Sequence, residues 1–284
     1  MCHLAGFLST HPTRVDCAVV RSQQAFTRQR SRHSRNFPRA TGWGAAYYGE
    51  EGPVVERRVI SPYDDFLFDP TVAATPTHAM IAHVRTGTIG RPERKNTHPF
   101  SHQAWTMAQA GTIENFYTLR RELMGELNPE YRRNIHGATD AEHVFFLFLS
   151  YLKRSAGSIA GDAPIHRMRD SFQKTIAMLN EMTGRSGSGI RSVFSLLLTN
   201  RQVMIAYCQH TPFYYVERDR AVVCPVCGES HVVLPAESSY RSVLVASEPV
   251  SGEEWKEIPD EHMVLVDPDV NVSVEPVCEP AEPE

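Results

Sequence analysis

Strand-like segments lie at both ends of this 284-residue chain, and helix-like segments lie between them. Short apolar runs separated by turn residues predict early strands over residues 3–9, 42–48, 54–60, 78–85 and 104–108. Later runs predict strands over residues 193–198, 203–207, 213–216, 222–224, 243–246 and 263–266. This order indicates an α+β fold in which two sheets pack together under helices, although other α+β layerings fit the same pattern.

The predicted helices occupy mainly the middle of the chain. Apolar residues recur at helical spacing near 113–123, across 140–153 and across 164–182. The stretch 140–153 is too apolar to face water, so we expect it to be buried. An earlier helix is also predicted, because one face of it would carry Val15, Ala18, Val19 and Phe26.

Composition limits the class of protein. With 42% hydrophobic and 22% charged residues, the chain can bury the core of one large domain or of two small ones. A net charge of -4 argues against a general nucleic-acid-binding protein. We see neither an apolar run long enough to span a membrane nor a secretory signal, so we expect a cytoplasmic protein with no membrane partner.

The second residue, Cys2, is the first candidate for chemistry. Removal of Met1 would leave a thiol and a free α-amine on one residue, directly before a predicted strand. The reference pKa of an α-amine is about 7.7 to 8.0, so near neutral pH the amine can accept the thiol proton directly or through one water. Taken alone, a cysteine at this position is explained by chance as well as by a role as nucleophile.

The order of motifs that follows Cys2 is informative. The chain carries Gly42-Trp43-Gly44, Ala82-His83-Val84-Arg85-Thr86-Gly87-Thr88, Asn96-Thr97-His98-Pro99-Phe100, Ala110-Gly111-Thr112-Ile113-Glu114-Asn115-Phe116 and Gly137-Ala138-Thr139-Asp140-Ala141-Glu142. In this order they resemble the class II glutamine amidotransferases, which are N-terminal-nucleophile hydrolases. A late Ala246-Ser247-Glu248-Pro249 followed by Trp255 looks like the stand-alone branch of that family.

The resemblance has consequences for fold and domain limits. It implies a four-layer αββα sandwich of two mostly antiparallel sheets covered by helices. It spans roughly residues 2–268, which we predict to be a single amidotransferase-like domain. The remaining residues, 269–284, are rich in acidic residues and proline and are expected to form a C-terminal tail.

A γ-glutamyl substrate offers a carboxylate, an ammonium and an amide to its binding site. Arg85 follows a predicted strand, where its guanidinium could bind the carboxylate bidentately, and the resemblance assigns it that role. Thr88 could add a donor to the same carboxylate. The resemblance makes Asp140 the partner of the ammonium and gives His98 a role in shaping the pocket. The alternatives are a surface arginine for Arg85 and a simple helix cap for Asp140.

The chain departs from the family at the oxyanion hole. Where the family usually carries His-Asn-Gly, this sequence has Gln109-Ala110-Gly111. The Gly111 N–H is retained, but the Asn side-chain donor is replaced by a methyl group. Loss of one such donor costs roughly a hundred- to a thousandfold in rate. Three explanations are open. Gln109 could replace the missing amide, which needs a local bend because neighbouring strand residues face opposite sides. Alternatively, the substrate is more activated or supplies its own donor, or the site binds its ligand without turnover.

A second group of cysteines suggests a metal site. Cys224 and Cys227 have the spacing and the following glycine of a zinc knuckle, and His231 with Cys208 or His210 could complete a structural site of four ligands. The alternative is that these thiols are free in a reducing compartment. No cofactor is expected for catalysis.

Two classes of function follow from these residues. In the first, the protein is an amidohydrolase whose Cys2 cleaves glutamine or another γ-glutamyl compound, releasing glutamate and ammonia or an amine. An ammonia-accepting synthase subunit is then a possible partner. In the second, it is a catalytically weak glutamine- or γ-glutamyl-binding subunit of a larger complex, because Ala110 replaces the family's asparagine.

Overall fold

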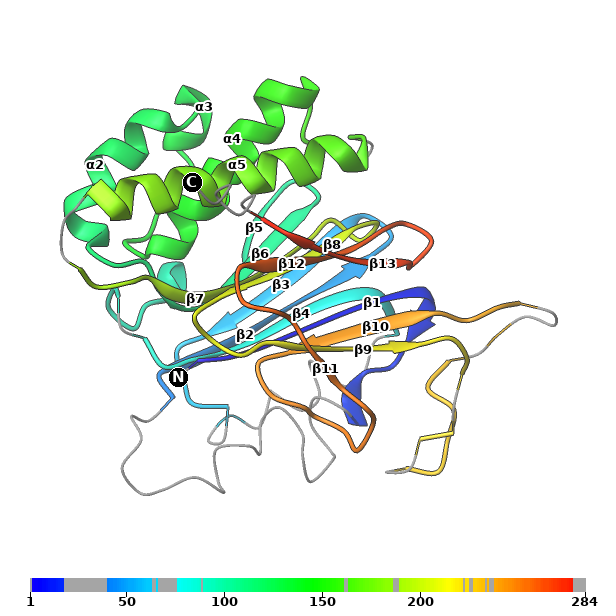
Figure 1. The fold of residues 1–284 in the computed structure, drawn as a ribbon. Coiled ribbons are helices and arrows are strands. Elements are labelled where there is room, and N and C mark those ends of the chain that lie inside the picture. Colours follow the sequence, from blue (N-terminus) through cyan, green and yellow to red (C-terminus); the bar gives the residue numbers. More distant parts are fainter. Residues whose placement is uncertain are drawn as a thin grey trace.

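A computed structural model provides the structure of the protein. It describes residues 2–17, 40–62, 65, 76–87, 89–160, 163–185, 189–221, 223–224, 227–232, 234 and 238–277. Two antiparallel sheets face each other, and helices cover one of them (Figure 1). The predicted α+β class and the pair of packed antiparallel sheets are therefore confirmed.

The first sheet is built around the amino-terminal strand. Its order is β11-β9-β10-β1-β4-β2-β3, so β1 lies between β10 and β4 near the centre. The strands are β1 (His3–Thr13), β2 (Gly42–Gly49), β3 (Gly52–Arg58), β4 (Thr77–Arg85), β9 (Tyr214–Arg218), β10 (Ser242–Ala246) and β11 (Lys256–Glu257). Register pairs His3 with Val84, which brings the start of β1 beside the end of β4.

The second sheet has the order β13-β12-β8-β7-β6-β5. Its strands are β5 (Phe100–His102), β6 (Trp105–Thr112), β7 (Val193–Thr199), β8 (Met204–Gln209), β12 (His262–Val266) and β13 (Val272–Pro276). Its neighbouring strands pair antiparallel throughout this order. Strand β6 ends where the chain enters the helical layer (Figure 1).

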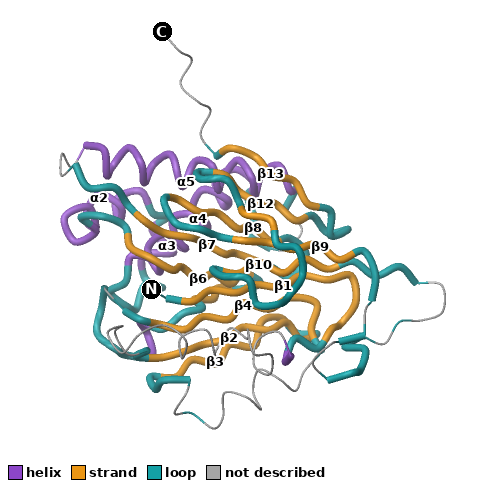
Figure 2. Tube along the Cα trace, turned by 60° about the horizontal axis from the view of Figure 1, so that its bottom comes forward, coloured by secondary structure: helices purple, strands orange, loops and turns teal. Residues whose placement is uncertain are grey.

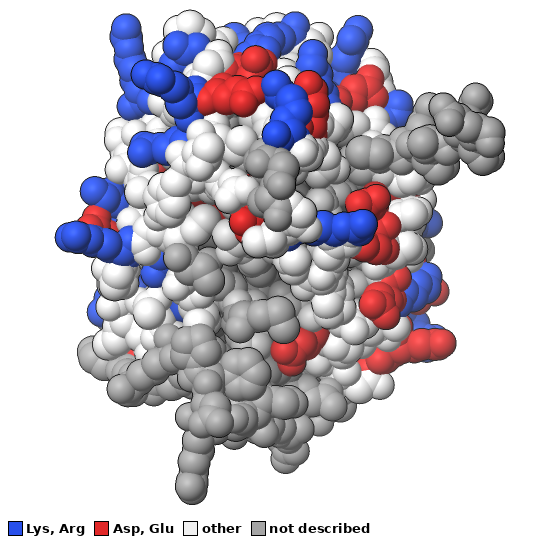
Figure 3. Space-filling view, turned by 60° about the vertical axis from the view of Figure 1, so that its left-hand side comes forward, with Lys and Arg blue, Asp and Glu red and all other residues white. Residues whose placement is uncertain are grey.

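Helices α2 (Phe116–Glu126), α3 (Pro129–Arg132), α4 (Asp140–Ala156) and α5 (Ile165–Arg185) lie on the outer face of this second sheet (Figures 1 and 2). The short 3-10 helix η3 (Arg94–Asn96) precedes β5. Helix α4 is buried over most of its length, as its composition predicted. Lys and Arg side chains gather on the outward side of this layer, where they remain solvated (Figure 3).

Strand alternation divides the core into three apolar layers. In β1, Leu4 and Leu8 point between the sheets, whereas Ala5 and Phe7 point to the outer face of the first sheet. In β6, Ala108 and Ala110 face the space between the sheets, whereas Trp105 and Met107 face the helices. This alternation decides which side chains can reach the amino terminus.

Two expectations need correction, and a third cannot be compared. Residues 272–276 form β13, paired with β12, so the first half of the predicted tail is part of the sheet. Of the predicted strand 222–224, Val223 makes one isolated bridge to Ser230 rather than a ladder. The early helix from Val15, and with it the predicted fourth layer, falls mostly on residues 18–39, outside the described part of the chain.

None of the described helices is both long enough and apolar enough to cross a bilayer.

Candidate active site

Cys2 lies at the start of β1, next to the chain segment that leaves β4. The backbone N–H of Thr86 donates to its Sγ at 3.2 Å, and the Thr86 carbonyl oxygen lies 3.6 Å from the same sulfur. The side chain is half-buried and packs against the core between the sheets, to which Ala110 also belongs. The antiparallel pairing of β1 with β4 fixes this position.

The protonation of the Cys2 thiol depends on its neighbours. Burial raises its pKa above the ordinary value, while the Thr86 N–H, the amino terminus and the Arg85 guanidinium lower it; Asp140 raises it further. Burial dominates, so the resting thiol holds its proton. A nucleophile in this state needs a base beside it. Because both charges affect the pKa of Cys2, Arg85 and Asp140 lie within electrostatic reach of its sulfur.

Arg85 is the last residue of β4 and is almost fully buried. Its Nη1 donates to Thr41 Oγ1 at 2.9 Å, and its Nη2 donates to the carbonyl oxygens of Ile89 at 3.0 Å and Gly90 at 2.9 Å. All of these acceptors are neutral, and no carboxylate among the described residues pairs with the guanidinium. Burial lowers its pKa. Arg85 is therefore a buried cation rather than the surface arginine of the alternative reading.

Asp140 begins α4 but does not cap it. The N-cap is Thr139, whose side chain accepts the N–H of Glu142 at 3.4 Å. The Oδ2 of Asp140 instead accepts the backbone N–H of Ile113 and the Nε2–H of Gln109, each at 2.8 Å. Burial raises the pKa of this carboxyl, and these hydrogen bonds oppose the rise. The helix-cap alternative is therefore wrong for Asp140, because Thr139 holds that position.

The residues of the altered oxyanion hole point in two directions. Ala110 faces the space between the sheets, on the side where Cys2 packs, whereas Gln109 faces the helices and donates to Asp140. No local bend reverses this alternation. The hypothesis that Gln109 replaces the missing asparagine amide is therefore wrong for this structure. Gln109 positions Asp140 instead.

Gly111 ends this segment in a conformation that a side chain would prevent. Its φ of 95° lies in the region that favours glycine, and a Cβ there would stand 2.1 Å from the Val193 carbonyl oxygen. Glycine is thus required for β6 to stay paired with β7 up to the turn.

His98 lies behind Gln109 rather than beside Cys2. Its Nδ1 accepts the Gln109 N–H at 3.2 Å, and its ring lies over His83 with 4.3 Å between centroids. Burial, and then the charge of Arg85, lower the pKa of His98 to about 3, so its ring is neutral near pH 7. Burial also holds the pKa of His83 well below its usual range. Two neutral imidazoles thus support β6, and sequence analysis singled out only one of them.

Thr88, the second predicted donor to the carboxylate, lies outside the described residues.

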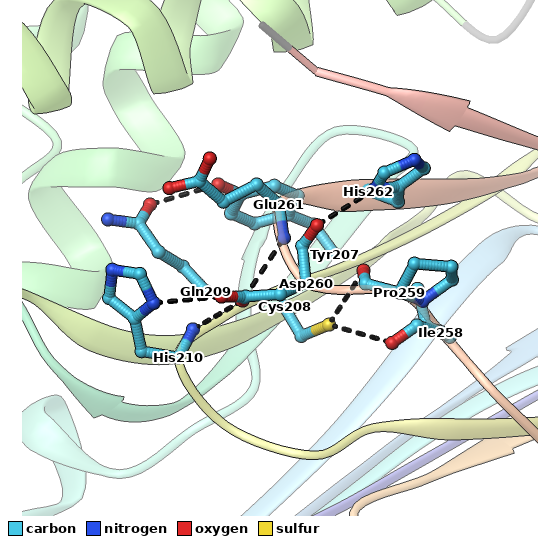
Figure 4. A network of polar contacts seen from close by, with 9 residues as sticks. All are labelled: Tyr207, Cys208, Gln209, His210, Ile258, Pro259, Asp260, Glu261 and His262. Carbon is cyan, nitrogen blue, oxygen red and sulfur yellow. Dashed lines mark hydrogen bonds and ion pairs between the residues drawn. The ribbon is translucent and has the colours of Figure 1, made fainter. Parts of the chain in front are cut away.

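The two residues considered as a fourth metal ligand, Cys208 and His210, make other contacts. Cys208 faces the loop after β11, with its Sγ 3.6 Å from the carbonyl oxygens of Ile258 and Pro259 (Figure 4). His210, the other proposed fourth ligand, pairs through Nδ1 with Asp260 at 2.8 Å (Figure 4).

The predicted metal ligands are therefore corrected in one member. Cys224, Cys227 and His231 do lie together, but the fourth residue of the cluster is Cys17 rather than Cys208. Cys208 is excluded because its strand, β8, belongs to the second sheet, and its side chain points into the core between the sheets. Sequence analysis could not find Cys17, because no spacing rule connects residues so far apart.

The fold is a sandwich of two antiparallel sheets, with Cys2 just before the central strand β1 and with Arg85 and Asp140 within electrostatic reach of its sulfur. The family model of class-II glutamine amidotransferases matches residues 1–281, and the chain belongs to this family.

Relatives of known name agree with the family. The probable glutamine amidotransferase DUG3 of Saccharomyces cerevisiae is 24% identical over 94% of this chain and 82% of its own length. The gamma-glutamyl-hercynylcysteine sulfoxide hydrolase of Mycolicibacterium smegmatis is 28% identical over 40% of this chain and 52% of its own length. A solved class-II glutamine aminotransferase domain protein from Silicibacter pomeroyi superposes with a TM-score of 0.65 at 16% identity, covering 98% of this chain and all of that one.

Proposed function

We propose that the protein is a cysteine amidohydrolase that cleaves the γ-amide bond of glutamine or of another γ-glutamyl compound. Cys2 would become the amino-terminal residue after removal of Met1 and would act as the nucleophile. The products would be glutamate and either ammonia or an amine. We also propose a reducing, cytoplasmic location, because none of the described cysteines forms a disulfide.

The observation that carries this proposal is the buried guanidinium of Arg85 close to the Cys2 thiol. A buried cation whose hydrogen bonds to the described residues go to neutral acceptors favours an anion from outside the chain. The α-carboxylate of a γ-glutamyl group is such an anion, and a guanidinium can bind it bidentately. Asp140, buried and held by Gln109 and Ile113, offers the opposite charge for the α-ammonium group.

The reaction would proceed in two steps. The free α-amine takes the Cys2 proton, and the thiolate attacks the γ-carbonyl carbon to form a tetrahedral intermediate. The Gly111 N–H stabilises the oxyanion. The protonated α-amine of Cys2 then gives the proton to the departing nitrogen, and the γ-glutamyl group remains bound to Cys2 as a thioester. Water, activated by the same amine, hydrolyses the thioester and releases glutamate.

The identity of the leaving group is a separate part of the proposal. Relatives act, by their names, as glutamine amidotransferases or as a hydrolase of a γ-glutamyl sulfoxide. A γ-glutamyl amine or peptide would need no acceptor subunit, whereas glutamine would need one if its ammonia is used in synthesis. The position of Ala110 favours a substrate that supplies its own hydrogen-bond donor.

The same alanine favours a second candidate function. With the asparagine donor absent, the site could bind γ-glutamyl compounds through Arg85 and Asp140 and turn them over poorly, as a binding subunit of a larger complex. Only turnover measurements distinguish the two functions, because an inactive site can still be alkylated at Cys2.

The test begins with intact mass, to establish that Met1 is removed. Glutamate release is then measured from glutamine and from a panel of γ-glutamyl amines and peptides, with Cys2→Ala as the inactive variant. Cys208→Ala is the matched control, because it removes a buried thiol away from the site. We expect release that Cys2→Ala abolishes and Cys208→Ala retains. No release from any substrate by the processed, folded protein would overturn the hydrolase and favour the binding subunit.

A further inference from the structure

Four potential metal ligands converge at the end of β1 that is remote from Cys2. They are Cys17, which follows the strand, and Cys224, Cys227 and His231, which come from a segment far away in the sequence. The ligand atoms of all four lie within 4.8 Å of one another, and the Cys227 Sγ lies 3.2 Å from the His231 Nε2. Three sulfurs and one imidazole nitrogen therefore surround a single point.

This arrangement matches the dimensions of a tetrahedral zinc site. With Zn–S bonds of about 2.3 Å and Zn–N bonds of about 2.0 to 2.1 Å, ligand atoms stand roughly 3.5 to 3.8 Å apart. The four ligand atoms lie within 4.8 Å of one another, about 1 Å above that spacing. Three thiolates and a neutral imidazole are a donor set that Zn²⁺ takes in structural sites.

The backbone around the ligands is held as a metal-binding turn requires. The Gly228 N–H donates to the Cys224 carbonyl oxygen at 2.8 Å, and the Cys224 N–H donates to the Glu229 carbonyl oxygen at 2.9 Å. Gly228 has a φ of 75°, which a residue with a side chain rarely adopts. These bonds fold the chain back on itself between Cys224 and Glu229, which keeps Cys224 close to Cys227.

Independent contacts bring this turn to the end of β1. Thr13 forms a β-bridge with Val232, and the Arg14 N–H donates to the His231 carbonyl oxygen at 2.9 Å. The Arg14 guanidinium also pairs with Glu229 at 3.6 Å. Backbone and ion-pair contacts thus hold the two segments together beside the four potential ligands.

A disulfide does not account for the cluster as well. One disulfide would use two of the three thiols. It would leave the third thiol and the His231 imidazole without a function. A site of four ligands uses every member.

We propose that Cys17, Cys224, Cys227 and His231 bind one structural zinc ion. The site has four protein ligands and no open position for water, so the ion would take no part in hydrolysis. Its function would be to fix the segment 223–232 to the end of β1, the strand that begins at the nucleophile.

The test uses the full chain purified with zinc available and then dialysed without a strong chelator. We expect about one zinc ion per chain by mass spectrometry of the metal, and replacement by Co²⁺ should give the intense visible absorption of tetrahedral cobalt with thiolate charge-transfer bands. Because the wild-type protein is used, failure of a variant to fold does not affect this measurement. Metal well below one equivalent, or a disulfide between two of the cluster's thiols by mass mapping, would overturn the proposal.

Variants then identify the ligands. Cys17→Ser, Cys224→Ser and Cys227→Ser should each lower zinc occupancy at least tenfold at a limiting zinc concentration, whereas the matched control Cys208→Ser should keep full occupancy. Full occupancy in Cys17→Ser together with loss in Cys208→Ser would overturn the ligand set proposed here.

Discussion

The two ends of strand β1 carry two different thiol sites. At the start, Cys2 stands as a single sulfur beside the Thr86 N–H, within electrostatic reach of Arg85 and Asp140. Just past the other end, Cys17 lies among two further sulfurs and an imidazole. One sulfur among opposite charges suits reaction with a substrate, whereas a group of soft donors suits a metal ion.

The difference between the sites lies in what surrounds the sulfur. At Cys2, a buried cation and a buried carboxylate lie within electrostatic reach, and we propose that they bind a substrate of matching charges. At Cys17, three further potential metal ligands lie within 4.8 Å. Changes at one site are therefore expected to leave the other intact, and the predictions below test this independence.

The largest expected effect comes from Arg85→Gln. Loss of charge-assisted hydrogen bonds of about 1.5 to 3 kcal/mol each predicts a fall in kcat/KM for a γ-glutamyl substrate of about a hundredfold or more, mainly through KM. Steady-state kinetics measures it. The control is Arg218→Gln, because Arg218 already pairs with Glu253 at 2.6 Å. An unchanged KM in folded Arg85→Gln would remove Arg85 from the binding site.

The next effect is a gain. Ala110→Asn should restore a donor on the side of Cys2 and raise kcat by about a hundredfold, the lower end of the range known for one oxyanion donor. Ala110→Val is the matched control, because it fills space without a donor and should not raise kcat. If Ala110→Asn leaves kcat unchanged, the substrate or another group supplies that hydrogen bond. Zinc content should be the same in both variants.

A smaller effect is expected from Gly87→Ala. A Cβ at Gly87 would stand 2.2 Å from the Arg85 Cζ, so the guanidinium must move. We predict a rise in KM of about tenfold with little change in stability, because the displaced atoms end a flexible side chain. Gly125→Ala is the control, since a Cβ there meets nothing within 4 Å. Equal kinetics for both variants would contradict the prediction.

The smallest effect concerns pH. The pKa of His98 is about 3 in the folded protein, against an ordinary value of 6.5, because of burial and Arg85. Between these values the unfolded chain binds more protons, so the free energy of unfolding falls as pH drops below 6.5. Between pH 7.5 and 5.5, the free energy of unfolding should therefore fall by about 1 kcal/mol less in His98→Asn than in the wild-type protein. Urea unfolding of the zinc-loaded proteins measures it, and an identical loss in both would contradict a buried, neutral His98.

Much of the fold was predictable from local patterns. Alternation and turn residues predicted β1, β2, β4 and the buried helix α4, because strand and helix periodicity are properties of neighbouring residues. The strand β13 was missed because the acidic, proline-rich end of the chain suggested a tail, although Val272, Ser273 and Val274 just before it alternate as strand residues do.

The residues of the candidate site were likewise predicted only in part. The motif order placed Cys2, Arg85, Asp140 and Gly111, and the structure brings the first three within electrostatic reach. The role of Gln109 was misjudged, because alternation along β6 sends its side chain to Asp140 and away from Cys2. Gly87 was missed as a support of Arg85, since only a structure shows the guanidinium lying against it.

The sequence by itself indicated an α+β fold, because strand and helix patterns are local. The order of its motifs carried the family resemblance, and that resemblance assigned roles to Cys2, Arg85 and Asp140. Only the tertiary structure decided that Arg85 is a buried cation bonded to neutral acceptors, that Gln109 turns away from Cys2 and that Cys17, not Cys208, meets the Cys224 turn. These features depend on which strands pair and which faces meet. Pairing between distant segments is set by the burial of the whole apolar surface, and no local pattern records it.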